Sequence, residues 1–266
     1  MLEIKLNLEH TLTCGQVFRF KKTDEGYTVF SKDKVAYCIQ NGDIALIKTE
    51  DEDYFYTYFD GDTDYSEIHS AMKCDETVSR LSEKYKGLRL LKQDLWEMTM
   101  SFIVSQNNNI PRIQGIVERL CEKFGEKTEH GYAFPSPSAL YDKEPSDLSE
   151  LKCGYRDSYL LDAAKKFHAN EIDAELILKG DINKAREELF KIKGIGPKVA
   201  DCVLLFGAGR MDAFPVDTWM KKALSTVYGI EVKSPTELRT FSEQKFGKFA
   251  GYAQQYLFFG ARNGDI

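Results

Sequence analysis

The sequence has few of the residues that build metal centres. It contains four histidines and six cysteines among 266 residues, and no two cysteines form a C-x-x-C pair. No histidine stands at zinc-finger spacing from a cysteine, so we expect neither a structural zinc site nor a cysteine-ligated iron–sulfur cluster. Cysteines without a disulfide pattern are typical of a reduced, intracellular compartment.

Long apolar runs and an excess of positive charge are also missing. No stretch approaches 18 consecutive apolar residues, and the first ten residues lack the apolar centre of a secretory signal. We therefore expect a cytoplasmic protein with no membrane partner. The 36 lysines and arginines are outnumbered by 42 acidic residues, for a net charge of −6. This balance excludes a polycationic nucleic-acid scaffold but leaves room for a local basic site.

The charge is unevenly distributed along the chain. Residues 49–72 carry eight acidic side chains and no lysine or arginine, which we interpret as a solvated face. Residues 191–200, KIKGIGPKVA, carry three lysines and no acidic residue. A nucleic-acid partner would therefore be held by a small basic face, with modest non-specific affinity that falls sharply with salt.

The pattern along the chain predicts an α+β protein. β-Branched and aromatic residues predict strands at 16–22, 27–32, 34–40 and 43–49, and Asn41-Gly42 is a strong hairpin signal. From residue 76 onward the apolar residues recur at helical spacing, apart from a proline-rich connection at 131–147. We expect an N-terminal antiparallel sheet domain at 1–90 and a mostly helical domain at 91–266.

The segment 191–202, KIKGIGPKVADC, is the most informative. A helix ends near Ile192, the turn through Gly194 and Gly196 follows, and Pro197 stands where a second helix begins. The glycines allow a tight turn and a close approach, and the amides of the turn and of the following helix form an anion site suited to a DNA phosphate. We predict a helix-hairpin-helix at about 183–208.

Two residues near this hairpin are candidates for chemistry. Lys198 lies in the first turn of the second helix, where the helix dipole disfavours a positive charge and favours the neutral amine that a nucleophile needs. Asp217 ends the loop 209–217 and precedes a predicted helix, so it could stabilise cationic charge developing on a sugar. From the residues alone, Lys198 could also be a solvated lysine that touches phosphate, and Asp217 could also be simply an N-cap.

Three further stretches have DNA-reading residue types. Asn107 and Arg112 lie in SQNNNIPR, and the forked donors of Arg112 suit a base edge. In CGYRDSY, the neighbours Tyr155 and Arg156 suit insertion into a base stack. Gln254 and Phe258 share a helix face, where one could bond a base edge and the other stack on a base. Each stretch also has an ordinary structural interpretation, as a helix break or a packed helix face.

These segments together resemble the helix-hairpin-helix superfamily of DNA glycosylases, and most closely the 8-oxoguanine DNA glycosylase family. The resemblance runs in order through CGQVFRF, GLRLLKQD, SFIVSQNNNIPRIQGIVERLC, CGYRDSYL, KGIGPKVADC, FPVDTWM and GYAQQYLF. It implies a TBP-like N-terminal sheet and a helical glycosylase body. It also implies a monomeric, prokaryotic-type enzyme of the nucleoid, whose partner is damaged double-stranded DNA.

The resemblance also implies a role for each candidate residue. Lys198 would be the nucleophile that forms a Schiff base, and Asp217 would assist electrostatically. The lesion base would be bound by Gly15, Cys202, Pro215, Gln254 and Phe258, with the Gly15 carbonyl accepting from the N7–H that guanine lacks. Asn107, Arg112, Tyr155 and Arg156 would hold the opposite cytosine and fill the gap.

The resemblance places the DNA phosphate at the amides of Gly194, Gly196 and Val199. It places a structural mono- or divalent cation at the carbonyls of Phe190, Ile192 and Ile195. No cofactor is expected for catalysis. Trp219 departs from the mammalian pattern, which has a phosphate-binding histidine at this position.

The expected activity is removal of 8-oxoguanine, preferably opposite cytosine, followed by strand cleavage through β-elimination. Two alternatives are a glycosylase for alkylated bases on the same fold, and a DNA-binding module without catalysis. The first uses water rather than a hairpin lysine, so Lys198 argues against it. Lys198 and Asp217 together argue against the second.

Overall fold

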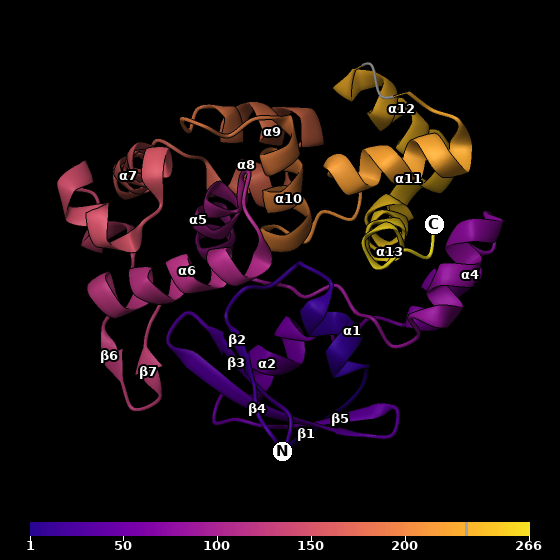
Figure 1. Ribbon diagram of the computed structural model, residues 1–266, viewed down its shortest axis with the longest axis horizontal. Helices are drawn as coiled ribbons and strands as arrows, with labels where there is room; N and C mark the ends of the chain where they lie inside the picture. The colour runs from indigo at the N-terminus through magenta and orange to yellow at the C-terminus, as the bar shows by residue number, and fades with distance from the viewer. Residues whose placement is uncertain (232–233) are drawn as a thin grey trace.

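The computed structural model describes residues 1–231 and 234–266. The N-terminal unit is a five-stranded antiparallel sheet with the order β1-β5-β4-β3-β2, at the lower edge of Figure 1. The sheet and the mostly helical body above it confirm the α+β prediction. The strands are β1 Leu2–Lys5, β2 Phe20–Lys22, β3 Tyr27–Ser31, β4 Lys34–Asn41 and β5 Ile44–Lys48.

The sheet differs from the prediction at its beginning. Strand β1, which pairs with β5, was not predicted, and the expected strand at 16–22 is reduced to Phe20–Lys22. The shortening has a physical cause, because Gln16 is buried and its side-chain amide donates to the carbonyls of Thr11 and Arg89, at 2.9 and 2.7 Å. The β4–β5 hairpin lies at the predicted joint 41–43: Asn41 ends β4 and pairs with Ile44, and the chain turns at Gly42-Asp43, with Gly42 at φ +61°.

Two helices cover one face of the sheet. They are α1, Leu8–Thr13, and α2, Glu52–Tyr58, and neither was predicted. Their apolar residues form a separate small core with the inward face of the strands. This core includes Leu8, Leu12, Val29, Ala36, Ala45, Ile47, Phe55 and Phe59.

The acidic stretch at 49–72 is not uniformly solvated, which corrects the sequence interpretation. Asp60 is 0 % exposed and has a left-handed backbone, with φ +57°. Its carboxylate pairs with Lys92 at 2.7 Å and accepts from the hydroxyls of Thr63 and Tyr65, at 2.6 and 3.0 Å. A buried carboxylate with these partners organises the chain locally.

The helical body surrounds helix α5, whose residues 97–104 are all buried. Helix α5 packs against α10, α6 and α7. The helices of the body are α3 Tyr65–Met72, α4 Glu76–Lys84, α5 Leu95–Ser105, α6 Ile110–Phe124, α7 Asp157–His168, α8 Ala174–Lys179, α9 Ile182–Phe190, α10 Pro197–Gly207, α11 Thr218–Tyr228, α12 Pro235–Phe246 and α13 Ala250–Asn263.

The connection between α6 and α7 has short elements of its own. They are β6 Lys127–Thr128 paired with β7 Gly131–Tyr132, and the 3-10 turns Pro137–Ala139, Pro145–Leu151 and Gly154–Arg156. The main core extends from Cys14 to Ala261 and takes in Ile68 and Leu81 of α3 and α4. The domain boundary at residue 90 stays a prediction. No described helix is long and apolar enough to cross a membrane.

The predicted helix-hairpin-helix is formed by α9 and α10, with the turn between them. A buried ion pair joins the two helices, because Arg186 Nε lies 2.6 Å from Asp201 Oδ1. Burial raises the pKa of the Asp201 carboxyl, and the Arg186 charge opposes this. Burying two charges is costly, but an unpaired one would cost more, so this pair fixes how the two helices meet.

We expect Asp201→Ala to lower the free energy of unfolding by about 3–5 kcal/mol, because it leaves the Arg186 charge buried and unpaired. Urea denaturation followed by circular dichroism measures the change. Glu175→Ala is the control, since it removes an exposed 3.2 Å pair with Lys179 and should change stability by less than about 1 kcal/mol. Equal effects of the two substitutions would contradict the role given to the buried pair.

Candidate active site

A small cavity of about 50 Å³ gathers residues from both ends of the chain. Both candidate catalytic residues and all five candidate lesion-base residues line it. The lining also includes Phe102, Phe206 and Gln255, which sequence reasoning did not select. In the sequence, Phe102 and Phe206 look like ordinary core residues of apolar helices. Gln255 has no signal that distinguishes it from its neighbour Gln254.

The start of α10 places Lys198 in this cavity. Gly196 is the N-cap residue and Pro197 the first helical residue, so Lys198 lies in the first turn. Its Nζ lies 5.6 Å from the centroid of the Phe102 ring on α5. Cys202 follows one turn later on the same helix face. The amine is therefore held between an aromatic ring and a thiol.

The Cys202 thiol is not a competing nucleophile. Burial raises the pKa of Cys202 to about 11, the nearby Lys198 charge opposes this rise, and Asp217 adds to it. Both charges act on the thiol because Lys198, Asp217 and Cys202 line the same cavity. The thiol therefore stays protonated near neutral pH, when only a thiolate would attack.

Asp217 is the N-cap of α11, and its carboxylate accepts from the Met220 amide at 2.9 Å. One bond fixes the carboxylate, and the carboxylate also lines the cavity. Asp217 therefore caps α11 and also shares the cavity with Lys198. Two residues further, Trp219 is 40 % exposed, and Lys222 Nζ lies 5.9 Å from its ring centroid.

Gln254 faces the cavity with one free atom. Its amide nitrogen donates to the Pro215 carbonyl at 3.1 Å, and its Oε1 is buried without a partner among the described residues. An unpaired buried acceptor is costly unless a ligand supplies a donor. The Gln254 carbonyl is thus available to a bound molecule that carries an N–H group.

The backbone conformation of Gly15 favours glycine, and the space around it is tight. Its φ is +88°, a region that L side chains rarely adopt. An added Cβ would also lie 3.1 Å from Arg262 Nη1 and 3.2 Å from Phe258 Cε1. The backbone of Gly15 therefore lies directly against Phe258 at the cavity.

The four residues expected to face the opposite base are brought together, but not in equivalent ways. Tyr155 is 53 % exposed, and Asn107 Nδ2 lies 3.5 Å from its hydroxyl. Arg112 is exposed and makes one long contact, 3.5 Å from Nη2 to the Lys152 carbonyl. Tyr155 and Arg112 are therefore accessible to a partner.

Arg156 is placed differently from the expectation. It is 4 % exposed, and its guanidinium donates to the carbonyls of Cys153, Gln106 and Asn107. Asn107 has φ +46°, and this turn leaves backbone carbonyls that need donors. In this arrangement Arg156 holds the loop that carries Asn107 and presents no free donor face.

The hairpin turn has open amides. Gly194 has φ +83°, and an added Cβ would lie 2.2 Å from the Tyr159 ring. The Asp162 carboxylate accepts from the Lys193 amide at 2.7 Å and so fixes the start of the turn. Among the described hydrogen bonds, none uses the amides of Gly194, Gly196 or Val199.

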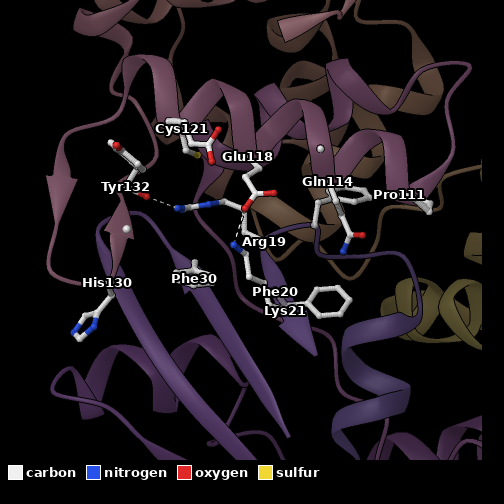
Figure 2. A pocket seen from close by; sticks show the side chains of 14 residues that line it. Arg19, Phe20, Lys21, Phe30, Pro111, Gln114, Glu118, Cys121, His130 and Tyr132 are labelled. Carbon is white, nitrogen blue, oxygen red and sulfur yellow. Dashed lines mark hydrogen bonds and ion pairs between the residues drawn. The ribbon is translucent and has the colours of Figure 1, made fainter. Parts of the chain in front are cut away.

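Larger cavities lie elsewhere among the described residues. One of about 530 Å³ lies between the sheet and α6, and Figure 2 shows its side chains. There Arg19 donates to the Tyr132 carbonyl at 2.8 Å, and Lys21 pairs with Glu118 at 2.6 Å. Two of its charged groups, Lys21 and Glu118, are thus paired with each other, whereas Lys198 and Asp217 lie in the smaller cavity. The described residues include no cluster of three or more His, Cys, Asp or Glu side chains arranged for a metal ion.

Two known protein families match the sequence of this chain. Residues 1–99 match the family described as 8-oxoguanine DNA glycosylase, N-terminal domain. Residues 100–248 match the family described as HhH-GPD superfamily base excision DNA repair protein.

The chain is also similar to named relatives and to solved structures. The chain is 31 % identical over 232 residues to the "Probable N-glycosylase/DNA lyase" of Methanothermobacter thermautotrophicus, covering 78 % of this chain and 74 % of that protein. It is 32 % identical over 223 residues to the N-glycosylase/DNA lyase of Saccharomyces cerevisiae, covering 69 % of this chain and 59 % of the yeast protein.

The crystal structure of Clostridium acetobutylicum 8-oxoguanine glycosylase/lyase, in complex with double-stranded DNA containing cytosine opposite 8-oxoguanine, is also similar. It superposes with a TM-score of 0.92 at 36 % identity, covering 99 % of this chain and 94 % of that one. The chain therefore belongs to the HhH-GPD superfamily of base excision DNA repair proteins and, within it, to the 8-oxoguanine DNA glycosylase family.

The thiols give a test of the site's electrostatics. Cys14 and Cys202 are buried, and burial raises the pKa of each to about 11, whereas Cys74 is exposed. With iodoacetamide at pH 8, we expect Cys74 to be alkylated and Cys14 and Cys202 to stay unmodified in the native protein. Peptide mass spectrometry measures this, with the urea-unfolded protein as the control. Rapid alkylation of native Cys202 would contradict the assignment.

Proposed function

We propose that this protein removes 8-oxoguanine from duplex DNA and then cleaves the strand at the resulting site. The observation that carries the proposal is the shared cavity of Lys198 and Asp217, lined also by Gly15, Gln254 and Phe258. A nucleophile, an anionic stabiliser and base-binding groups are what glycosylase/lyase chemistry requires. We further propose that the enzyme acts as a cytoplasmic, nucleoid-associated monomer of prokaryotic type.

Lys198 is the nucleophile. Its neutral amine attacks C1′ of the flipped nucleotide, and the bond from C1′ to N9 breaks with its electron pair leaving on the base. The proton released from the alkylated Lys198 nitrogen goes to the departing base. The lone pair of the Lys198 nitrogen then forms the C=N bond as the bond from C1′ to O4′ breaks, and O4′ takes a proton, which opens the sugar ring and leaves a protonated imine. A base removes a C2′ proton, and the bond from C3′ to O3′ breaks with its electron pair leaving on the phosphate. Water then hydrolyses the imine and frees Lys198.

Asp217 stabilises the positive charge that develops on the sugar as the bond to the base breaks. The Met220 amide holds its carboxylate in place, so little reorganisation is needed when the charge appears. The Phe102 ring and the Cys202 thiol limit water around Lys198, which strengthens these electrostatic interactions.

The lesion is read by hydrogen bonds and stacking. The Gly15 carbonyl accepts from N7–H of 8-oxoguanine, whereas guanine would present a lone pair there, a mismatch that costs roughly 1–3 kcal/mol. The free Gln254 Oε1 accepts from the base edge, and Phe258 and Cys202 enclose the ring, with Pro215 at the wall. Because the cavity measures about 50 Å³, well below the roughly 300 Å³ of typical ligand sites, lining side chains move when the base enters.

The hairpin binds the backbone of the DNA. The amides of Gly194, Gly196 and Val199 bind a phosphate, as expected where a helix dipole adds positive charge. The carbonyls of Phe190, Ile192 and Ile195 fit a mono- or divalent cation, because they are neutral oxygen donors near the end of α9. The Ile192 carbonyl accepts from the Ile195 amide at 3.1 Å and keeps a second lone pair. A bound cation would add positive charge beside the phosphate.

Other side chains hold the opposite strand. Tyr155 fills the space of the flipped base, Asn107 and Arg112 contact the cytosine, and Arg156 acts by holding the loop of Asn107. Near the flipped nucleotide, Lys222 beside Trp219 supplies the positive charge that a histidine gives elsewhere in the family.

The nucleophile can be tested by borohydride trapping. With a duplex containing 8-oxoguanine opposite cytosine, wild type should form a covalent adduct, and Lys198→Gln should form none. Lys193→Gln is the matched control, because Lys193 is exposed on the same hairpin, and it should still give the adduct. Base release without an adduct by wild type would indicate a water-using glycosylase, and binding without release would indicate a DNA-binding module.

The opposite-base preference can be tested by single-turnover excision against all four opposing bases. Wild type should act fastest opposite cytosine. Arg112→Ala should reduce that preference by about tenfold, since one good base contact contributes roughly 1–3 kcal/mol. Lys123→Ala, at an exposed position near the other end of α6, should leave the preference unchanged. Equal wild-type rates against all four bases would contradict the proposed contacts.

A further inference from the structure

Side chains hold the backbone around Gly15 at three of the four positions 13–16. The Thr13 carbonyl accepts from Arg262 Nη2, and the Cys14 carbonyl accepts from Gln255 Nε2 at 2.9 Å. The Gln16 carbonyl accepts from Gln93 Nε2 at 2.8 Å. Among the described hydrogen bonds, the Gly15 carbonyl accepts none. It is the one carbonyl of residues 13–16 left for a ligand.

Two of these donors come from the same stripe of α13. Gln255 and Arg262 are seven residues apart, which is two helical turns and brings them to the same face. Phe258 lies between them on that face, 5.6 Å from Arg262 Cζ to its ring centroid. Gln255 is buried and lines the cavity, yet its amide turns to Cys14. This arrangement ties the backbone before Gly15 to the helix that carries Gln254 and Phe258.

Gly15 by itself cannot hold this direction. Glycine is required at φ +88°, but it also has access to many other backbone conformations. Rotation of the peptide group between Cys14 and Gly15 would break the hydrogen bond that Gln255 donates to the Cys14 carbonyl. Rotation of the peptide group after Gly15 is limited by Gln16, whose side chain accepts from the Leu91 amide at 2.9 Å. The hydrogen bonds on either side of Gly15 therefore restrict the backbone conformations that this glycine could otherwise adopt.

We propose that Gln255 and Arg262 are positioning residues for lesion recognition, which fix the direction of the Gly15 carbonyl through the carbonyls of Cys14 and Thr13. The inference rests on the proposed function, in which that carbonyl reads N7–H of 8-oxoguanine. It adds that recognition depends on two donors that touch neither the base nor the reacting atoms. Excision of the lesion base should therefore depend on them, whereas strand cleavage at a site already lacking a base should not.

The test compares two reactions of one enzyme. Gln255→Met keeps the length of the side chain but removes the donor. We expect single-turnover excision of 8-oxoguanine opposite cytosine to fall about tenfold, the effect of losing roughly 1.4 kcal/mol of hydrogen bonding. Cleavage of a duplex with a preformed abasic site should stay within about twofold of wild type, because it needs Lys198 but no base recognition.

Gln40→Met is the matched control. Gln40 Nε2 also donates to a backbone carbonyl, that of Leu6 at 3.0 Å, but it lies outside the residues that line the cavity. This variant should leave both rates unchanged. Arg262 provides a second pair of variants, in which Arg262→Leu should lower excision selectively and Arg262→Lys, which keeps a donor, should restore part of it. If Gln255→Met does not fold, excision and abasic-site cleavage are compared in these two Arg262 variants instead.

The outcomes separate this inference from the proposed function. Parallel loss of excision and abasic-site cleavage would show that Gln255 and Arg262 only support the fold, and would overturn the inference. Unchanged excision in Gln255→Met and Arg262→Leu would overturn it too. If wild type cleaves abasic sites but leaves 8-oxoguanine in place, the proposed function itself fails, and the inference falls with it.

Discussion

The beginning of helix α10 is the constraint on which the site depends. Gly196 caps the helix and Pro197 starts it, so the next residue, Lys198, is delivered to the cavity by the same turn that exposes the hairpin amides. The two functions are inseparable, because both follow from where the helix dipole begins. The buried pair of Arg186 and Asp201 and the Asp162 bond to Lys193 then fix that start relative to the rest of the body.

The other side of the site comes from α13, which combines contacts to the cavity with contacts to the N-terminal unit. Gln254 and Phe258 line the cavity, while Gln255 reaches the backbone beside Gly15. Asp217 belongs to a third segment and is held only by the start of its own helix. The site is thus the meeting point of helix starts and one helix face, a design in which rigid elements, rather than long loops, set the geometry.

Much of this arrangement could be predicted from the sequence, because it depends on local signals. The Gly-x-Gly-Pro turn, the Asn-Gly hairpin and the aspartate before α11 each have a direct conformational meaning. What could not be predicted depends on distant partners. Asp60 looked like one more acid in a solvated run, and only the fold brings Lys92 and Tyr65 to it. Arg156 looked like an exposed cation in the sequence, but its guanidinium donates to carbonyls at the left-handed turn of Asn107.

The same limit explains Gln255. Its sequence neighbour Gln254 matched a family pattern, whereas the role of Gln255 depends on a carbonyl 241 residues away. That separation has a consequence for the way the protein is made. During synthesis on the ribosome, Gly15 emerges long before α13 exists, so the segment that would distinguish damaged from normal bases stays unformed until almost the whole chain has been released. A chain that ends before α13 lacks Gln254, Gln255 and Phe258, and therefore lacks one wall of the cavity.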